Sequence, residues 1–314
     1  MSTVPYATAY HAPVLSQTVL KYLVTDINGT YVDATAGGGG HVAAILSVLS
    51  SKGRVVAIDR DADAVQTVEA RLPDAIKMKQ LVVYKGRFSN LQNLIPNLLP
   101  VTGLLLDLGV SSHQLDSGQR GFSHRQRAHL DMRMDTEFDI TAADIVNGST
   151  EDELVSILRS WGEEPYARRI ARAITANQPV ETTTDLAHIV RDAVPTRWES
   201  RAVSRTFQAL RIAVNGELDE LAQLLESSPE IVAEGGRMVV ISYHSLEDRM
   251  VKRMLRDGVL EGESRRDLYG NRLVPWKPVT RRPVVPDAAE IAANRRSRSA
   301  RLRAGVRCPV PVST

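Results

Sequence analysis

Four consecutive glycines follow a short apolar stretch that ends in an acid, in Tyr31-Val-Asp-Ala-Thr-Ala-Gly-Gly-Gly-Gly-His41. A β-branched, apolar start that stops abruptly at glycine is typical of a buried strand followed by a helix. Because glycine has no Cβ, the turn can take positive φ, and the N–H groups that begin the helix can lie against a ligand. We therefore expect a flat, polar or phosphorylated ligand to rest on this turn.

The glycines also satisfy a loose dinucleotide-binding pattern, Gly38-x-Gly40-x-x-Ala43. Asp59 lies 19 residues beyond Gly40, at the end of the next predicted strand, where a carboxylate can accept hydrogen bonds from both ribose hydroxyls. Strand, helix and acid in this register predict an adenosine cofactor without saying which one. The alternative is that the glycines only make a tight turn.

A second acid, Asp107, ends an apolar run in Leu104-Leu-Leu-Asp-Leu-Gly-Val-Ser-Ser-His-Gln114. In a doubly wound sheet this fourth strand lies beside the first, so Asp107 should face the cofactor crevice. There it could hold an adenine amine or a cofactor ammonium, or accept a hydrogen bond from a substrate amine. The alternative is an acid that only caps a loop.

The segment Leu130-Asp-Met-Arg-Met-Asp135 places an arginine between two acids. Phosphate would repel Asp131 and Asp135, so these acids either organise a loop through Arg133 or bind base edges. A self-contained salt-bridged loop is an equal alternative.

A polar cluster follows a predicted strand in Ile241-Ser-Tyr-His-Ser-Leu-Glu-Asp248. Ser245-x-x-Asp248 has the pattern of a capping box, which would account for two of these residues. His244 could line the pocket at the ligand-bearing edge or be structural. Since no Gly-x-Ser-x-Gly surrounds the serines, a hydrolase is not indicated.

Short βα repeats predict an α/β fold with a parallel, doubly wound sheet. The region from 112 to 214 contains loop and helix signals only, and this favours a helical domain inserted between two strands, with residues 1–111 and 215–314 forming the core. The expected strands are 31–33, 54–59, 81–85, 103–108 and 236–242, with a last edge strand at 300–306, and the expected helices include 41–49, 62–72, 89–99, 163–176 and 245–255.

Composition and charge limit the cellular compartment and the binding partners that can be expected for the protein. The net charge is +2, yet the segment 281–307 carries eight arginines and two acids, a net of 8 − 2 = +6, which makes it either a phosphate contact or a solvated surface. The single cysteine, the lack of a long apolar run and the lack of a signal peptide predict a cytoplasmic protein without a membrane segment. His113, His124 and His129 have no compact ligand spacing, so no metal is expected.

These motifs together resemble the bacterial 16S ribosomal RNA cytosine-N4 methyltransferase family, over about residues 11–303. The resemblance is carried by Asp33-Ala-Thr-x-Gly-x-Gly-Gly-His41, Ile58-Asp-Arg-Asp61, Leu105-Leu-Asp-Leu-Gly-Val-Ser-Ser112, Gln114-Leu-Asp116, Arg120-Gly-Phe-Ser123, Leu130-Asp-Met-Arg-Met-Asp135, Gly162-Glu-Glu164, Thr206-Phe-Gln-Ala-Leu-Arg211, Val214-Asn215 and Ser242-x-His-Ser-Leu-Glu-Asp-Arg249.

The resemblance implies S-adenosylmethionine as cofactor, a class I methyltransferase core, and an inserted helical domain that helps recognise the small ribosomal subunit. The implied product is an N4-methylcytidine in the decoding region of 16S rRNA. Phe88 would be an aromatic or apolar wall for adenine. By position, the family's cofactor contacts fall on Gly39, Gly40, His41, Asp59, Phe88, Asp107 and Gln114.

The chain departs from the family pattern mainly in the loop expected to approach RNA. His113 stands where the family usually has proline, and Arg127-Ala128-His129 stands where Asp-Gly-Pro is usual. Further departures are Ser16, Thr18 and Pro165. The residues at the family's cofactor contacts are unaffected. The resemblance therefore constrains the identity of the cofactor more than the details of the RNA target.

Cytosine's amine is a poor nucleophile, so positioning and an acceptor for the amine proton should supply most of the catalysis. The base would first have to leave its stack. Alternatives are an NAD-dependent oxidoreductase and a non-enzymatic ribosome assembly factor; a monomer or a homodimer is expected. The candidate catalytic residues are Asp107, Ser112, Asp131 and His244, and the candidate substrate contacts are Arg133, Asp135 and Asn215.

Overall fold

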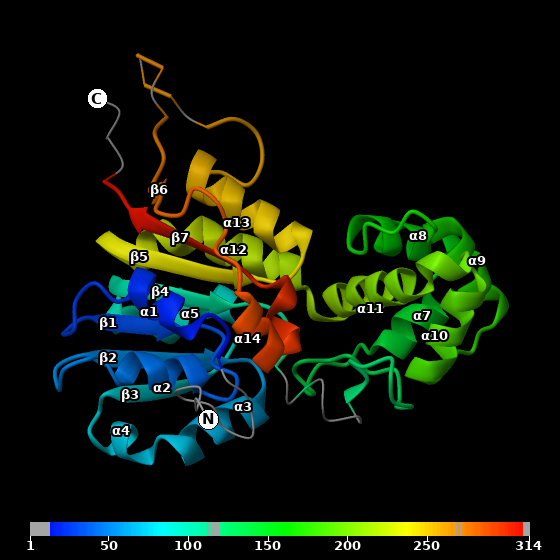
Figure 1. The fold of residues 1–314 in the computed structure, drawn as a ribbon, viewed down its shortest axis with the longest axis horizontal. Coiled ribbons are helices and arrows are strands. Elements are labelled where there is room, and N and C mark those ends of the chain that lie inside the picture. The colour runs from blue at the N-terminus through cyan, green and yellow to red at the C-terminus, as the bar shows by residue number, and fades with distance from the viewer. Residues whose placement is uncertain are drawn as a thin grey trace. The chain divides into compact units, whose positions relative to one another are not determined.

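The computed structural model describes residues 13–111, 114, 120–264, 266–267, 269–270 and 272–309. The chain divides into two compact units, a core unit of residues 1–109 and 219–314 and a helical unit of residues 110–218. Figure 1 shows the ribbon of both units, coloured along the chain. The boundaries of these units lie two to four residues from the expected limits at 112 and 214.

The core unit is built on one seven-stranded sheet in the order β3-β2-β1-β4-β5-β7-β6. Strands β1 to β5 run parallel, whereas β7 runs antiparallel to both β5 and β6. The strands are β1 Thr30–Asp33, β2 Arg54–Asp59, β3 Leu81–Lys85, β4 Val101–Asp107, β5 Val232–Ser242, β6 Trp276–Pro278 and β7 Arg301–Arg307. The order reverses between β1 and β4, so their carboxyl ends border the position where doubly wound sheets bind ligands. The predicted α/β fold class is confirmed.

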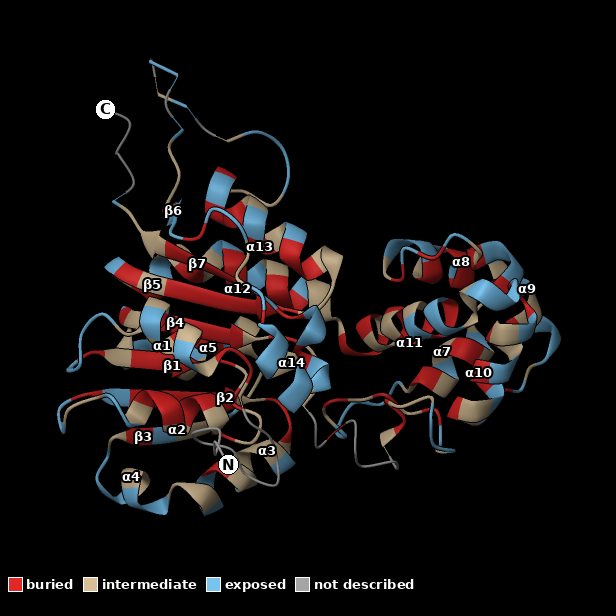
Figure 2. Cartoon of the chain, in the orientation of Figure 1, coloured by how far each residue is buried: buried red, intermediate tan, exposed pale blue. Residues whose placement is uncertain are grey.

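Helices cover both faces of this sheet, and β1, β2, β4 and the second half of β5 are therefore largely apolar and buried, as Figure 2 shows along β5. One face packs α1 and α2 against a core that contains Tyr31 and Leu105. The other face packs α5, α12 and α13 around Val32 and Leu104. The helices are α1 Ser16–Leu23, α2 Gly40–Leu46, α3 Ala62–Arg71, α4 Pro73–Lys77, α5 Leu91–Leu94, α12 Glu217–Ile231, α13 Ser245–Asp257 and α14 Ala288–Ala293.

Two predictions for the core unit were wrong. The helix expected at 89–99 is broken into η1 Phe88–Asn90, α5 and η2 Pro96–Leu98, because Pro96 has no N–H to donate and disfavours a helical residue before it. The strand expected at the edge, β7, lies between β5 and β6. The three-residue β6 was missed, since only its pairing with β7 and the fully buried Trp276 define it.

The helical unit has a hydrophobic core of its own, which includes Leu154, Ile170 and Phe207. Within its described residues, β structure is limited to an isolated bridge between His129 and Thr182. The helix expected from 163 begins at Ala167. The helices are α7 Ala142–Gly148, α8 Glu151–Ser160, α9 Ala167–Ala176, α10 Thr183–Asp192 and α11 Glu199–Asn215, with η4 Thr196–Trp198 before α11.

Over the residues that the structure describes, none of the helices combines the length and the apolar character needed to span a bilayer.

Candidate active site

The glycine turn between β1 and α2 has the positive φ angles that its sequence predicts. Gly37 has φ +49°, and Gly39, the N-cap of α2, has φ +73°. A Cβ on Gly39 would lie 3.2 Å from Cγ2 of Val68, and one on Gly40 would lie 3.1 Å from Cβ of Pro13. A larger residue at Gly39 would therefore crowd the Val68 side chain, and one at Gly40 would crowd Pro13. At Gly39 its backbone would also be strained, because φ is positive.

Asp59, at the end of β2, fixes this turn. Its Oδ2 accepts a 2.8 Å hydrogen bond from the Gly37 N–H, and its Oδ1 accepts one of 2.9 Å from the Asp61 N–H. Burial raises the pKa of Asp59 to about 6, although both backbone bonds act against the shift. Each carboxylate oxygen has two lone pairs, so Asp59 keeps acceptor capacity for two hydroxyls.

Asp33, His41 and Asp107 form a buried polar cluster beside the turn. Asp33 ends β1 and is fully buried, and burial raises its pKa to about 6. Its Oδ2 has no hydrogen-bond partner among the described residues. The His41 Nε2 lies 3.5 Å from Oδ2 of Asp107. Burial lowers the pKa of His41, but the carboxylates of Asp107 and Asp33 outweigh it, and the pKa is raised overall.

Asp107, at the end of β4, is held from several directions. The Tyr243 hydroxyl donates a 2.9 Å hydrogen bond to its Oδ1, and the Asp107 N–H donates one of 2.6 Å to Oγ1 of Thr35. Its side chain is 22% exposed, so the carboxylate remains accessible from the carboxyl edge of the sheet. Burial and the adjacent carboxylate raise the pKa of Tyr243 well above its usual value, which keeps the hydroxyl protonated as a donor.

Tyr243 is a site residue that the sequence analysis missed. It comes directly after β5, and β5 pairs with β4, so the ends of the two strands share one edge. An aromatic residue that carries a hydroxyl immediately after a strand at the ligand-bearing edge was the available signal.

Phe88 opens η1 three residues after β3, as its predicted role requires. The Oε2 of Glu220, on α12, lies 3.2 Å from Nη1 of Arg60. Burial raises the pKa of Glu220, while the charge of Arg60 opposes the shift. Phe88 itself lies just beyond the carboxyl end of β3. Contact with adenine stays a prediction.

The predicted capping box at the start of α13 was wrong by one residue. His244, not Ser245, is the N-cap: its Nδ1 accepts the Glu247 N–H at 3.4 Å, and the Glu247 carboxylate accepts the His244 N–H at 3.2 Å. The His244 Nε2 also lies 3.1 Å from Oε1 of Glu247. Capping thus accounts for the geometry of His244 without a substrate.

In the helical unit, Asp131 and Arg133 form a two-pronged ion pair, with Nε to Oδ1 and Nη2 to Oδ2 both at 2.8 Å. Burial is the largest single influence on the pKa of Asp131, and it raises that pKa. The hydrogen bonds and the charge of Arg133 together outweigh burial, so the pKa of Asp131 is lowered overall. Arg133 also donates to the carbonyl oxygens of Thr136 and Phe138. Arg133 therefore organises this loop, which is one of the two roles predicted for it.

The remaining predicted residues of the helical unit have local partners. Asn215 is buried, its Oδ1 accepts the Met134 N–H at 2.8 Å, and its Nδ2 donates to the carbonyl oxygens of Met132 and Arg211. Asp135 accepts the Glu137 N–H. The buried Gln114 accepts the Ser111 N–H at 2.9 Å. Ser112 and His113 lie outside the described residues.

The core unit fits an adenosine cofactor that carries a cationic group. The turn presents backbone at Gly39 and Gly40 where a Cβ would be crowded, Asp59 has lone pairs for a ribose, and Asp33 keeps a buried carboxylate oxygen without a described partner. Acids at the ends of β1, β2 and β4 favour a ligand with a positive charge over a dianionic one.

This sheet, with β7 antiparallel between β5 and β6, has the Rossmann-like strand arrangement of the class I methyltransferase fold. The model of the MraW methylase family matches residues 8–307, and the chain belongs to that family.

Two relatives, at 42% and 45% identity, agree with this assignment. The chain is 42% identical over 302 residues to "Ribosomal RNA small subunit methyltransferase H" of Caldicellulosiruptor bescii, covering 93% of this chain and 97% of that protein. It is 45% identical over 294 residues to the protein of the same name from a Cyanothece species, covering 93% of each. A solved rRNA methylase from Streptococcus thermophilus is 12% identical, with a TM-score of 0.38 over 94% of each chain.

Proposed function

We propose that this methyltransferase transfers a methyl group from S-adenosylmethionine to N4 of a cytidine in the decoding region of 16S rRNA, in the cytoplasm. The relatives' names support the ribosomal RNA, and the motifs quoted above support the cytosine amine. The observation that carries the proposal is Asp107, an accessible acid at the end of β4 whose carboxylate is oriented by Tyr243. No metal is part of the proposal.

The proposed cofactor site combines the glycine turn with acids at the strand ends. When bound, the cofactor supplies a methyl group activated on a positively charged sulfur. Asp59 would accept the ribose hydroxyls, Phe88 would flank the adenine, and Gln114 is included from the resemblance. The residues proposed to hold the cofactor are Gly39, Gly40, His41, Asp59, Phe88, Asp107 and Gln114.

The contribution of Asp107 follows from the chemistry of the amine. The N4 lone pair of cytosine is delocalised into the ring, and an acceptor for one amine hydrogen favours the pyramidal, nucleophilic form. Asp107 can accept such a bond because Tyr243 occupies only one lone pair of Oδ1. His41 lies against Oδ2 and stabilises the charged carboxylate, so the acid stays an acceptor.

The helical unit is proposed to recognise the RNA. Arg133 and Asp131 shape one loop, and Asp135 lies half-buried in the same segment, so these three residues are the proposed contacts. Asn215 is proposed as a positioning residue, because its amide is engaged by the backbone. His244 is proposed to act through the start of α13. Ser112 stays a candidate from its motif alone.

Methyl transfer from labelled S-adenosylmethionine to purified small subunits tests the proposal. The modified nucleoside, identified after digestion, should be N4-methylcytidine. Another methylated nucleoside would overturn the assignment of the target atom. Binding of the cofactor without transfer to any small-subunit RNA would favour a non-enzymatic role.

Two substitutions test the roles of individual residues. Asp131→Ala should raise the KM for the RNA substrate, since Arg133 loses its partner. His244→Ala should lower activity through the start of α13, whereas His244→Asn, which keeps a capping side chain, should restore it. Activity near that of the unaltered enzyme in both alanine variants would contradict these assignments.

A further inference from the structure

Helix α13 has a basic face that packing does not use. Its apolar residues Val251, Met254 and Leu255 are buried where the helix packs against β5, β6 and β7. Arg249 and Lys252 are exposed, three residues apart on the outer side. Residues at this spacing are neighbours on a helix surface. The helix therefore presents neighbouring positive charges outward.

The acids of α13 do not offset this charge, because they lie on its inner side. Asp248 accepts bonds of 2.7 and 3.0 Å from buried Arg303, and Glu247 bonds the N-cap. Asp257 pairs with Arg256 and Arg272. Each negative charge of the helix thus has an inner or terminal partner, and the exposed charged residues on its outer side are basic.

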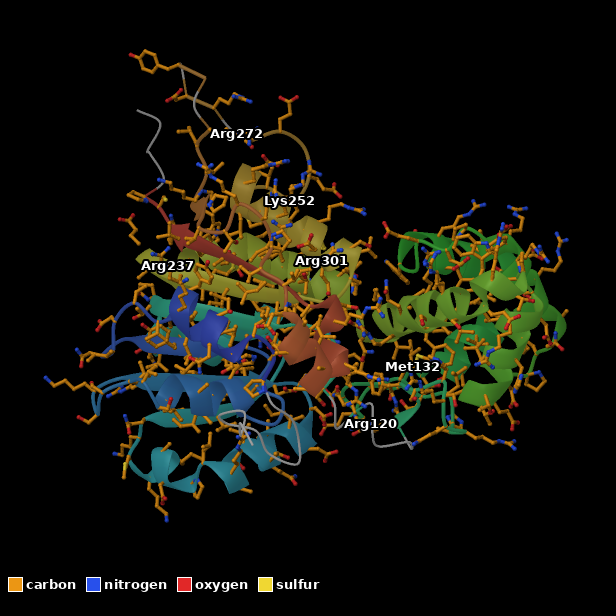
Figure 3. All side chains as sticks on the ribbon, in the orientation of Figure 1. Arg120, Met132, Arg237, Lys252, Arg272 and Arg301 are labelled. Atoms are coloured by element: carbon orange, nitrogen blue, oxygen red, sulfur yellow. The ribbon has the colours of Figure 1, made fainter. Side chains whose placement is uncertain are left out.

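Part of the arginine-rich C-terminal segment continues this face. Arg303 and Arg307 are directed to internal partners, Asp248 and the Pro229 carbonyl. Arg301 is 48% exposed and its Nη1 lies 3.5 Å from Oδ2 of Asp248, so it adjoins α13 (Figure 3). The exposed arginines of η5, Arg295–Ser299, directly precede it. The α13–η5 basic surface consists of Arg249, Lys252, Arg295, Arg296, Arg298 and Arg301.

This surface begins at the edge of the sheet that carries the candidate active site. Arg301 opens β7 and pairs in register with Ser242, the last residue of β5. The next residue, Tyr243, donates its hydroxyl to Asp107. A polyanion bound along α13 would therefore extend toward the sheet edge that carries Asp107. All of the residues that make this connection belong to the core unit.

We propose that the α13–η5 basic surface binds the phosphate backbone of the RNA substrate beside the target nucleotide. The inference rests on the proposed function, and it extends RNA binding from the helical unit to the methyltransferase core. A membrane surface is not favoured, since the apolar side chains of α13 are buried and cannot insert into lipid. Exposed Glu261 and Glu263 follow α13 and limit the surface at its far end.

Charge reversal at Lys252 and Arg298 tests this proposal in the full-length protein. The Lys252→Glu, Arg298→Glu variant should bind small-subunit RNA about tenfold more weakly at ~0.1 M salt, because two phosphate contacts become repulsive. The slope of log K against log salt concentration should become shallower by about 1 to 2. The Kd for S-adenosylmethionine and the Tm should not change.

The matched control reverses two lysines elsewhere on the core unit. Lys52 and Lys77 are exposed and precede β2 and β3, so they lie toward the amino ends of the strands. The Lys52→Glu, Lys77→Glu variant changes the net charge equally, and it should keep both the RNA affinity and the salt slope. An equal loss in both variants would show a non-specific charge effect and overturn the proposal.

Other results separate this inference from the proposed function. If the unaltered enzyme methylates small-subunit RNA and the α13–η5 variant does so with the same KM and salt slope, the surface proposal alone fails. If the variant loses binding to assembled subunits and keeps binding to protein-free RNA, the surface contacts a protein, and the phosphate proposal is overturned. If the unaltered enzyme neither binds nor methylates the RNA, the proposed function itself fails.

Discussion

The hydroxyl of Tyr243 lies 2.9 Å from Oδ1 of Asp107 and joins the end of β5 to the end of β4. The two residues are 136 positions apart in sequence, with the whole helical unit between them. Their contact gives the acid a fixed direction at the edge where the strand order reverses. Asp107 can therefore accept a hydrogen bond from an amine without reorganising.

Removal of that hydroxyl should slow the reaction without weakening the binding of the cofactor. A hydrogen bond to a charged group contributes about 1.5–3 kcal/mol, so Tyr243→Phe should lower kcat by about tenfold or more. Steady-state kinetics with the RNA substrate and calorimetry with S-adenosylmethionine measure the two effects. Tyr22→Phe, at a half-buried tyrosine on α1, is the control and should retain full activity. An unchanged kcat in Tyr243→Phe would show that the Tyr243 hydroxyl does not orient Asp107 for the reaction.

Asp59 should matter for the cofactor more than for the chemical step. Asp59→Ala removes the proposed acceptor for the ribose hydroxyls and also leaves the N–H groups of Gly37 and Asp61 without this carboxylate. We expect the Kd for S-adenosylmethionine to rise by about ten- to a hundredfold, with a smaller change in kcat at saturating cofactor. Asp74→Ala, at an exposed acid, should have no effect on the Kd. A large loss of kcat with an unchanged Kd would place Asp59 in another role.

Asp33 should make the stability of the core unit depend on pH. Burial raises its pKa to about 6, so the folded state binds more protons than the unfolded state between about pH 4 and 6. Ionisation of Asp33 thus lowers the free energy of unfolding as pH rises through that window, by up to about 3 kcal/mol. His41, which faces Asp33, moderates the effect.

The matched variant is Asp33→Asn, which cannot ionise at this position. Urea unfolding at pH 4.5 and pH 7 should show that the variant gains stability relative to the unaltered protein at the higher pH, by about 1–3 kcal/mol. Asp74→Asn supplies the control, because that carboxyl is exposed. A stability difference that is independent of pH would show that Asp33 does not titrate in this range.

Asn215 should be important for stability because its buried side-chain amide bonds the backbone of the loop at Met132 and Met134, and also the Arg211 carbonyl oxygen of its own helix. Asn215→Ala leaves the Met134 N–H and the Met132 carbonyl oxygen without this partner, at a cost of about 2–4 kcal/mol. Urea unfolding measures the loss. Asn177→Ala removes an exposed asparagine that bonds the Ala173 carbonyl oxygen, and should cost less than about 1 kcal/mol. A fully stable Asn215→Ala variant that lost RNA binding would instead show direct contact with the base.

Features whose signals are local could be predicted from the sequence alone. Glycine at positive φ, the acids that end β1, β2 and β4, and amphipathic helices depend on neighbouring residues, so the glycine turn, Asp59, Asp107 and most strands were predicted. The predicted N-cap of α13 was wrong by one residue, because histidine is an unusual N-cap. The helix predicted at 89–99 was too long, because it continued across Pro96.

Features that depend on pairing between distant segments became evident in the folded structure alone. The position of β7 between β5 and β6, the bond from Tyr243 to Asp107 and the burial of Arg303 against Asp248 all join residues that are not neighbours in the sequence. Composition could not separate the inward arginines of the C-terminal segment from the outward ones. Arg301 and Arg303 lie two residues apart on the same face of β7, and both approach Asp248 of α13, but only Arg303 is buried there. This difference leaves Arg301 at the edge of the sheet and Arg303 inside it.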